Sequence, residues 1–348
     1  MQSQRKTYLD LLRIVAILLV IFNHMPGYSE YYYHTDLKFG IYVIPAIITR
    51  INVPLFWMIS GALLLRKTES LSQVFQHRIS RIALTIFLSG GILYLLKNFS
   101  TLNITDFIQK LLSNGIEESY WFLYTYLGIL FLLPYLQRIA QHFSKKDFLY
   151  FLVLHAAFHS ILPMLNYILQ CKYGTSVSIR LSLPLITENA FFFFFMGYYL
   201  ENVFDISKLC LFKLTKIIAG MTFCVAISTA FIYHQGITTG FSQSYLSLFD
   251  YIIAITIFIS TKYLFTQSKT LHNFSFANKM ISCIGSLTFG IYLLDPILKH
   301  FFYKAFENAL EPSLPTFICS IVWTLLSALV CGSLSFFLKK LPGFRFIL

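Results

Sequence analysis

The chain has 348 residues, of which 57% are hydrophobic and only 12% are charged, and its mean hydropathy is +0.67. These values exclude an ordinary soluble domain and indicate a polytopic membrane protein. The net charge of +12 does not indicate nucleic-acid binding, because basic residues gather in the cytoplasmic loops of membrane proteins. The six cysteines include no close-spaced pair, so neither a disulfide framework nor a metal site is predicted.

Apolar runs along the whole chain predict an all-α fold with about ten transmembrane helices. The predicted ranges are 8–27, 40–65, 82–98, 120–139, 147–165, 186–203, 214–233, 243–265, 283–302 and 315–338. Most Lys and Arg residues fall in segments on the side of the N-terminus, which places both termini in the cytoplasm of a plasma-membrane protein. No internal repeat or appended soluble domain is recognised, so residues 1–348 are predicted to form a single membrane domain.

The first apolar run, from Asp10 to His24, contains ionisable residues, which are costly inside a membrane and therefore indicate function. Asp10 and Arg13 are three residues apart, so they share a helix face and can pair. Arg13 and His24 lie within about 20° of one face and about 16 Å apart along the axis. One stripe thus carries a cation toward the inner surface and an imidazole toward the outer one. The alternative for each residue is an interfacial side chain without a catalytic role.

The second predicted helix contains another cation, Arg50, toward its outer end. Pro54 leaves a backbone carbonyl without its donor, and Gly61 allows a close approach between helices. An ordinary kinked helix is the alternative. Glu188 opens the sixth predicted helix at its outer end, where its carboxylate can face a cavity.

Two arginines, Arg78 and Arg81, stand at the end of the first inner loop. They are three residues apart, so a helix starting here would carry both on one face. Two guanidinium groups on one face suit phosphate binding. The alternative is the usual enrichment of basic residues in inner loops.

The ninth predicted helix contains Asp295 directly before Pro296, in its outer half and at a depth comparable to that of His24. The proline interrupts the hydrogen-bond ladder of the helix. An acid in this place can orient an imidazole, accept a hydrogen bond from a hydroxyl, or pair with Arg50 or Lys299. The sequence leaves these possibilities open.

Six short segments, in their order and spacing, resemble the integral-membrane acyltransferases of the acyltransferase-3 type. The segments are Asp-Leu-Leu-Arg-x10-His at 10–24, Val-Pro-Leu-Phe-Trp-Met-Ile-Ser-Gly at 53–61, Arg-x-x-Arg at 78–81, Trp-Phe-Leu at 121–123, Gly-Tyr-Tyr-Leu at 197–200 and Phe-Gly-Ile-Tyr-Leu-x-Asp-Pro at 289–296. Many members have His-Pro where this chain has Asp295-Pro296. A role for that histidine is therefore not transferred to this chain.

The resemblance implies transfer of an acyl group, usually acetyl, from cytoplasmic acyl-CoA to a hydroxyl of a cell-surface glycan or a similar acceptor such as a lipid-linked sugar. It implies that Arg13 and His24 are the essential pair and that Arg78 and Arg81 contact the CoA end. Acyl-CoA is then a substrate, and no tightly bound cofactor is expected. The expected partners are the donor, the sugar acceptor, membrane lipids and polysaccharide-synthesis machinery, with no nucleic acid.

Within this scheme His24 is predicted to be the general base, because its ordinary pKa lies near neutrality. Asp295 or Glu188 is predicted to orient it. Arg50 or a backbone N–H at a broken helix is predicted to stabilise the oxyanion. Arg13 is placed near the inner mouth of the donor path.

Two other functional classes are compatible with charges inside the membrane. A transporter or exporter of a glycan or lipid-linked intermediate places such charges along its substrate path. Many transporters, however, contain a repeat of the first half in the second, which is not recognised here. A non-catalytic partner of a polysaccharide synthase is the third class. Covalent acyl transfer by the purified protein would distinguish an enzyme from both.

Overall fold

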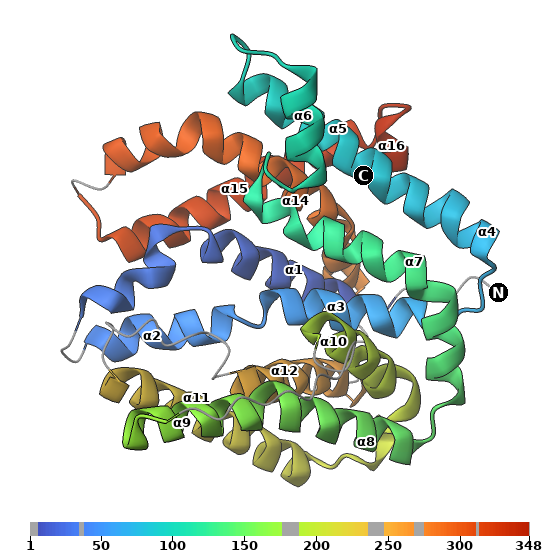
Figure 1. Ribbon diagram of the computed structural model, residues 1–348, viewed down its shortest axis with the longest axis vertical. Helices are drawn as coiled ribbons and strands as arrows, with labels where there is room; N and C mark the ends of the chain where they lie inside the picture. The colour runs from blue at the N-terminus through green and yellow to red at the C-terminus, as the bar shows by residue number, and fades with distance from the viewer. Residues whose placement is uncertain are drawn as a thin grey trace. The chain divides into compact units, whose positions relative to one another are not determined.

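The computed structural model describes residues 6–34, 38–175, 188–235, 247–267, 275–310 and 313–347, and these residues contain helices and no strand (Figure 1). The long α-helices are α1 (Thr7–Asn23), α2 (Lys38–Thr49), α3 (Asn52–Leu64), α5 (Ser80–Lys97), α7 (Trp121–His142), α8 (Lys145–His155), α9 (Leu162–Tyr173), α10 (Asn189–Tyr198), α11 (Leu211–Gln235), α12 (Ser247–Gln267), α14 (Ser275–Leu310) and α15 (Thr316–Leu338). The short α-helices are α4 (Leu71–Val74), α6 (Ile104–Leu112) and α16 (Phe344–Ile347). The 3-10 helices are η1 (Pro26–Tyr33), η3 (Glu118–Tyr120) and η6 (Ile206–Lys208), and the π-helices are η2 (Phe75–Ile79), η4 (Ala156–Ile161) and η5 (Tyr199–Val203).

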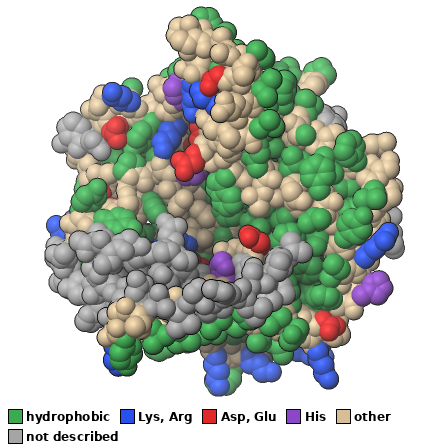
Figure 2. Space-filling model, in the orientation of Figure 1, with side chains coloured by type: hydrophobic (Ala, Val, Ile, Leu, Met, Phe, Trp, Pro, Cys, Tyr) green, Lys and Arg blue, Asp and Glu red, His purple; other side chains and the backbone are tan. Residues whose placement is uncertain are grey.

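Among the described residues, seven helical segments are long and apolar enough to cross a membrane, or eight if the bent pair of α1 and η1 counts as one span. The all-α membrane fold is therefore confirmed, and the expected number of about ten spans is roughly consistent with it. Hydrophobic side chains cover much of the surface drawn in Figure 2. A lipid environment favours such a surface, because it offers no water to polar groups.

The chain divides into two compact units, each built from segments that are distant in sequence. Unit 1 contains Met1–Leu63, Phe143–Ser286 and Ser313–Thr324. Unit 2 contains Leu64–His142, Leu287–Pro312 and Leu325–Leu348. The residues predicted to be functional are divided between them: the first helix and its neighbours belong to unit 1, whereas the two loop arginines and the acid of the ninth helix belong to unit 2.

In unit 1, α3 and α10 pack against each other at two glycines. A Cβ atom on Gly61 would lie 1.7 Å from the carbonyl oxygen of Phe194, and a Cβ on Gly197 would lie 1.9 Å from the carbonyl oxygen of Met58. The backbone of each helix thus occupies the space that a side chain on the other would need. The close approach predicted at Gly61 is confirmed.

A buried carboxylate joins three elements at one end of unit 1. Glu201, in η5, is 9% exposed and binds Lys6 and the hydroxyl of Tyr8. Its third partner is Lys262 of α12, whose Nζ lies 3.3 Å from the carboxylate and also donates to the carbonyl oxygen of Leu200 at 2.8 Å. The cations compensate the cost of burying the acid. The predicted topology places these three chain positions on one side of the membrane.

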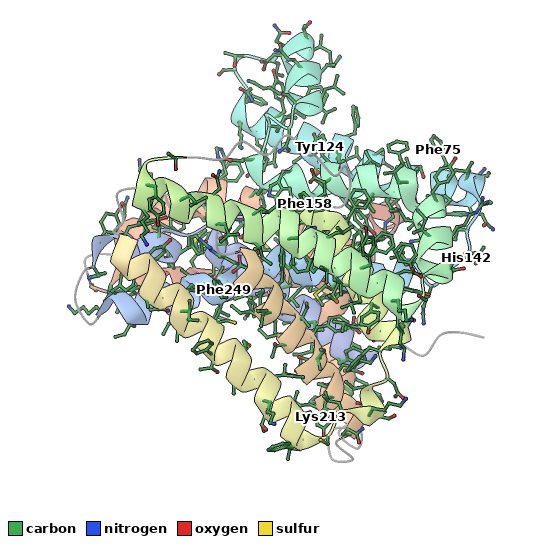
Figure 3. All side chains as sticks on the ribbon, turned by 60° about the horizontal axis from the view of Figure 1, so that its bottom comes forward. Phe75, Tyr124, His142, Phe158, Lys213 and Phe249 are labelled. Carbon is green, nitrogen blue, oxygen red and sulfur yellow. The ribbon has the colours of Figure 1, made fainter. Side chains whose placement is uncertain are left out.

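The helices α11 and α12 pack as an antiparallel pair in unit 1. In Figure 3, Lys213 near the start of α11 and Phe249 near the start of α12 lie at opposite ends of the pair. The helix α12 also contacts α1, where the rings of Tyr8 and Phe258 meet edge to face with centroids 6.4 Å apart. This packing fixes α1, which contains Arg13 and ends at His24, against the body of unit 1.

In unit 2, α7 continues through Pro134 to His142, three residues beyond the predicted range. Phe75, which is labelled in Figure 3, lines a shallow apolar pocket of about 370 Å³ together with Phe131 and Pro134. The side chain of Gln137 in α7 is buried and donates to the carbonyl oxygen of Leu64 at 3.0 Å. This bond attaches the loop that follows α3 to α7.

Candidate active site

The first turns of α1 carry a buried ion pair. The Nη1 atom of Arg13 lies 2.6 Å from Oδ1 of Asp10, whose exposed fraction is 0%. A Cβ added to Gly285 would lie 2.6 Å from the Cβ of Asp10, so the start of α14 packs directly on the acid. The predicted pairing of Asp10 with Arg13 is therefore confirmed. The pair holds the guanidinium against α1.

The stripe between Arg13 and His24 is buried. Ile17 and Val20, which lie on the same stripe, are 1% and 7% exposed. The helix is uninterrupted from Thr7 to Asn23, so the predicted axial separation of about 16 Å applies. Because the residues between them are buried, the stripe does not face lipid along its middle.

His24 lies at the C-terminal cap of α1, where the chain bends by 59° into η1. Its backbone N–H bonds the carbonyl oxygen of Ile21 at 3.1 Å, which closes the last turn. The C-terminal end of a helix favours a positive charge by about 0.3–1 kcal/mol. An imidazole at this position is suited to accept a proton, because the resulting cation is stabilised by the helix.

Arg50 stands in a break within the predicted range 40–65, just before Pro54: α2 ends at Thr49 and α3 begins at Asn52. The guanidinium interacts electrostatically with Asp250 of α12 and with Tyr28 of η1. Its Nη1 atom is buried and has no hydrogen-bond partner within the part of the chain that the structure describes. Arg50 thus has an acidic neighbour that the sequence did not identify.

Glu188 is exposed at the N-terminal cap of α10, and its side chain makes no capping bond there. The next residue, Asn189, accepts a hydrogen bond of 2.5 Å from the hydroxyl of Tyr251, which lies 2.8 Å from Nε2 of His155. The rings of His155 and His159 stack with centroids 5.0 Å apart. Among the described residues, no group of three His, Cys, Asp or Glu side chains is arranged to hold a metal ion.

In unit 2, Arg78 forms a two-pronged ion pair with Glu69. The distances are 2.8 Å from Nε to Oε2 and 2.7 Å from Nη2 to Oε1. The carboxylate also accepts a 3.3 Å bond from the amide of Gln137. These hydrogen bonds, foremost those from Arg78, hold the pKa of Glu69 below its ordinary value. Arg78 therefore has a strong partner within its own loop.

Arg81 has a different environment from Arg78. Its Nη2 atom donates to the carbonyl oxygen of Ile347 at 3.3 Å, and its buried Nε atom has no hydrogen-bond partner among the described residues. Arg78 lies inside the π-helix η2, whereas Arg81 lies in α5. Because a π-turn contains more residues than an α-turn, it changes the angle between the two side chains. The two arginines thus have separate hydrogen-bond partners, but both interact electrostatically with Tyr126, so the predicted joint role of the pair stays a prediction.

Asp295 lies within α14, which continues through Pro296 as a helix. Its carboxylate is buried and accepts a 2.5 Å hydrogen bond from the hydroxyl of Ser327. Lys299, one turn further along, interacts with it electrostatically. These residues belong to unit 2 and His24 belongs to unit 1. The orientation of His24 by Asp295 stays a prediction.

The sequence from residue 6 to residue 333 matches the family model Acyl_transf_3, described as an acyltransferase domain. The chain belongs to this acyltransferase family. No curated protein and no solved structure matches the sequence. The protein is therefore a multi-pass membrane acyltransferase.

Two of the segments that carried the family resemblance hold a close backbone contact between two helices of the acyltransferase. Residues 53–61 end with Gly61, and residues 197–200 begin with Gly197. These segments thus place α3 against α10, while the segment 10–24 supplies α1 with its ion pair and histidine. The family pattern combines packing positions with candidate catalytic ones.

Sequence reasoning missed three partners in this acyltransferase: Glu69, Asp250 and Ser327. Glu69 is a lone acid in a basic loop, which is a usable signal for a local ion pair. Asp250 is the only acid in its predicted helix, which is a weaker signal. A single serine in an apolar helix gives no signal, because such residues commonly bond their own backbone.

Proposed function

We propose that this acyltransferase moves an acyl group, in the first place acetyl, from cytoplasmic acyl-CoA to a hydroxyl of a cell-surface polysaccharide or its lipid-linked precursor. The proposal rests on helix α1 in a chain that belongs to the acyltransferase family. Arg13 is paired with Asp10 near one end of this helix, and His24 lies at the helix break at the other end. The protein then resides in the plasma membrane with both termini in the cytoplasm.

In the proposed reaction, His24 removes the proton from the acceptor hydroxyl while the hydroxyl oxygen attacks the thioester carbonyl. A tetrahedral oxyanion forms and collapses, the bond from carbon to sulfur breaks, and the CoA thiolate takes the proton from the imidazolium. The position of His24 at the C-terminal end of α1 supports this role, because the helix stabilises the cation between the two proton transfers.

Two roles are open to Arg50. Stabilising the oxyanion is the role that the sequence predicts. Binding the acceptor is the other, and the neighbouring carboxylate of Asp250 favours it, because a nearby negative charge repels a developing oxyanion. A backbone N–H then remains as the candidate for stabilising the oxyanion.

The proposed donor contacts are Arg78 and Arg81, which bind CoA phosphates. The partially unsatisfied guanidinium of Arg81 supports its part of the proposal. Arg78 either releases Glu69 and binds a phosphate, or it keeps its ion pair with Glu69 and holds the loop in place while Arg81 binds the phosphate. A double pairing with two arginines is a common way to bind a phosphate.

The direct test is His24→Ala in purified full-length protein. Removal of a positioned general base lowers turnover by about 100- to 10,000-fold. Turnover is measured as CoA thiol release coupled to acyl transfer, and melting temperature reports folding. The matched control is His142→Ala, since His142 is exposed at the end of α7. Near-parental turnover of His24→Ala would refute the base assignment.

A second experiment identifies the acceptor. The surface glycans of a deletion strain and its parent are compared by NMR for acyl esters. Loss of one ester signal, with the amount of glycan unchanged, is expected for an acyltransferase. Loss of the glycan itself from the surface would instead support an exporter.

A further inference from the structure

A second polar cluster in unit 1 has no role in the proton transfers described above. It comprises Arg50 at the break between α2 and α3, Asp250 at the start of α12, and Tyr28 in η1. Arg50 and Asp250 are both half-buried. The inner atoms of the two side chains, Nη1 of the arginine and Oδ1 of the aspartate, are buried and have no hydrogen-bond partner among the described residues.

An orphaned buried donor and an orphaned buried acceptor on two side chains that interact electrostatically are costly, because each atom has lost water without gaining a partner. A ligand that offers both a hydrogen-bond acceptor and a donor would satisfy both atoms. The opposite charges select a neutral ligand, since an anion is repelled by Asp250 and a cation by Arg50. Neighbouring hydroxyl groups fit this requirement, because each hydroxyl both donates and accepts.

The cluster lies close to His24 along the chain. Tyr28 is only four residues beyond His24, so their Cα atoms are at most about 14 Å apart. The outer residues of η1 are aromatic: the rings of Tyr31 and Tyr32 stack with centroids 4.3 Å apart, and Tyr32 is 43% exposed. Tyr31 also interacts electrostatically with Arg50. Aromatic rings offer an apolar face beside the polar pair.

We propose that Arg50 and Asp250 bind two neighbouring hydroxyls of a sugar ring, which is the acceptor of the transfer reaction. Arg50 donates to one hydroxyl oxygen, and Asp250 accepts from the next hydroxyl. The rings of η1 lie along the apolar face of the sugar. This assignment rests on the proposed function, and it makes Arg50 and Asp250 residues that select the acceptor.

The competing explanation is an internal ion pair that only supports the fold. The two explanations differ when both charges are removed together. Neutralising one member of a structural pair leaves an uncompensated charge, and neutralising the second relieves that cost. If the pair binds the sugar hydroxyls, the second substitution does not restore sugar binding, because both hydrogen bonds to the sugar stay weakened.

The experiment uses purified full-length protein in lipid nanodiscs. The variants are Asp250→Asn, Arg50→Gln and the double variant, with Thr256→Val as control, since Thr256 is a buried residue of the same helix. Saturation-transfer NMR measures binding of methyl α-D-mannopyranoside, methyl α-D-glucopyranoside and methyl α-D-galactopyranoside. Tetrahydropyran-2-methanol, a ring of the same size with one hydroxyl, is the negative probe. Melting temperatures report folding.

The parental protein and Thr256→Val are expected to bind at least one glycoside and not the negative probe. Each single variant and the double variant are expected to bind that glycoside at least tenfold more weakly. With an accepted glycoside as acceptor, its KM is expected to rise at least tenfold, while the KM for acyl-CoA changes less than twofold.

Recovery of parental binding in the double variant would overturn the proposal in favour of an internal ion pair. Parental protein that binds none of the three glycosides, or binds the negative probe equally well, would also overturn it. Glycoside binding that depends on Asp250, in a parental protein that transfers no acyl group, would refute the proposed function and leave the binding site standing.

Discussion

Unit 1 contains two clusters in which acidic and basic side chains lie together. The two clusters differ in how completely their charged atoms are hydrogen-bonded. At one, the carboxylate of Glu201 is bound by Lys6, Lys262 and a tyrosine hydroxyl. At the other, Arg50 and Asp250 interact electrostatically, while the inner atom of each side chain lacks a hydrogen bond among the described residues. The first cluster is satisfied by partners within the protein and supports the fold, whereas the second is the one that we propose binds a ligand.

The two clusters differ in the free-energy cost of their buried charges. A buried charge is stable only when partners replace the water that it has lost. Glu201 has three such partners, so its removal would leave the two lysines without the acid that compensates their charges. The cluster of Arg50 and Asp250 retains part of this cost in the free protein, and a bound ligand would relieve it.

The largest stability effect is expected for Glu201→Ala. It leaves Lys6 and Lys262 without their shared acid, and loss of one partner from a buried pair costs about 3–5 kcal/mol. Asp205→Ala is the matched control, because Asp205 is an exposed acid in the next loop and its pair with Lys208 is worth little. Thermal melting in detergent measures both. If Asp250→Asn lowers the melting temperature as much as Glu201→Ala, the contrast between the two clusters is wrong.

The next largest effect is expected for Arg78 and Arg81 in unit 2, where the two substitutions should have different consequences. Arg81→Ala is expected to raise the KM for acyl-CoA by about 10- to 100-fold, which corresponds to about 1.5–3 kcal/mol for a hydrogen bond to a charged group. Arg78→Ala is expected to lower the melting temperature as well, because it leaves Glu69 without its main partner. Unchanged KM values for both variants would show that the two arginines do not bind acyl-CoA and only help to fix the membrane topology.

A smaller effect is expected at the acid of α14. Asp295→Asn should lower turnover per folded molecule by about tenfold, or about 1.4 kcal/mol, if its charge supports the transfer. Ser327→Ala removes the hydroxyl that Asp295 accepts from and should cost about 1 kcal/mol of stability with near-parental turnover. Equal loss of stability in both variants, with turnover preserved, would make Asp295 purely structural.

The smallest effect concerns pH and the ion pair of Glu69 with Arg78. The pKa of Glu69 is lowered in the folded protein, so the pair stabilises the fold above the ordinary glutamate pKa of about 4.3. This contribution is lost as the pH falls through the lower folded pKa. The difference in melting temperature between the parental protein and Glu69→Gln should therefore be largest above pH 5 and shrink toward pH 3. A difference that is constant with pH would contradict this account.

The sequence predicted those features that depend on local spacing. Apolar runs located the helices, because a helix that spans lipid needs about 20 apolar residues. The pairing of Asp10 with Arg13 followed from helix geometry alone. Gly61 was identified because a missing side chain in an apolar helix is useful only where another backbone approaches closely.

The features that the sequence did not predict depend on contacts between distant residues. Glu201 lies 195 positions from Lys6, and no periodicity connects them. The same holds for Arg50 and Asp250, which meet only after α12 packs beside α2. The π-helices were also missed, because local propensity favours a continuous α-helix there. The break at Arg50 lies just before Pro54, where the sequence indicated a weakened helix.

Because Arg78 lies in the π-helix η2, the structure of the Arg-x-x-Arg segment depends on the exact number of residues before it. The sequence motif alone does not show this dependence. A π-turn can be regarded as an α-helical turn with one inserted residue. Deleting one residue from Phe75–Ile79 would convert this segment to an ordinary α-helical turn and change the directions of the side chains within it, Arg78 included. Arg78 and Arg81 would then no longer keep their separate partners. In the evolution of related chains, a one-codon insertion or deletion just before Arg78 would therefore reorganise the loop that we propose binds the donor, while every motif residue stays in the sequence.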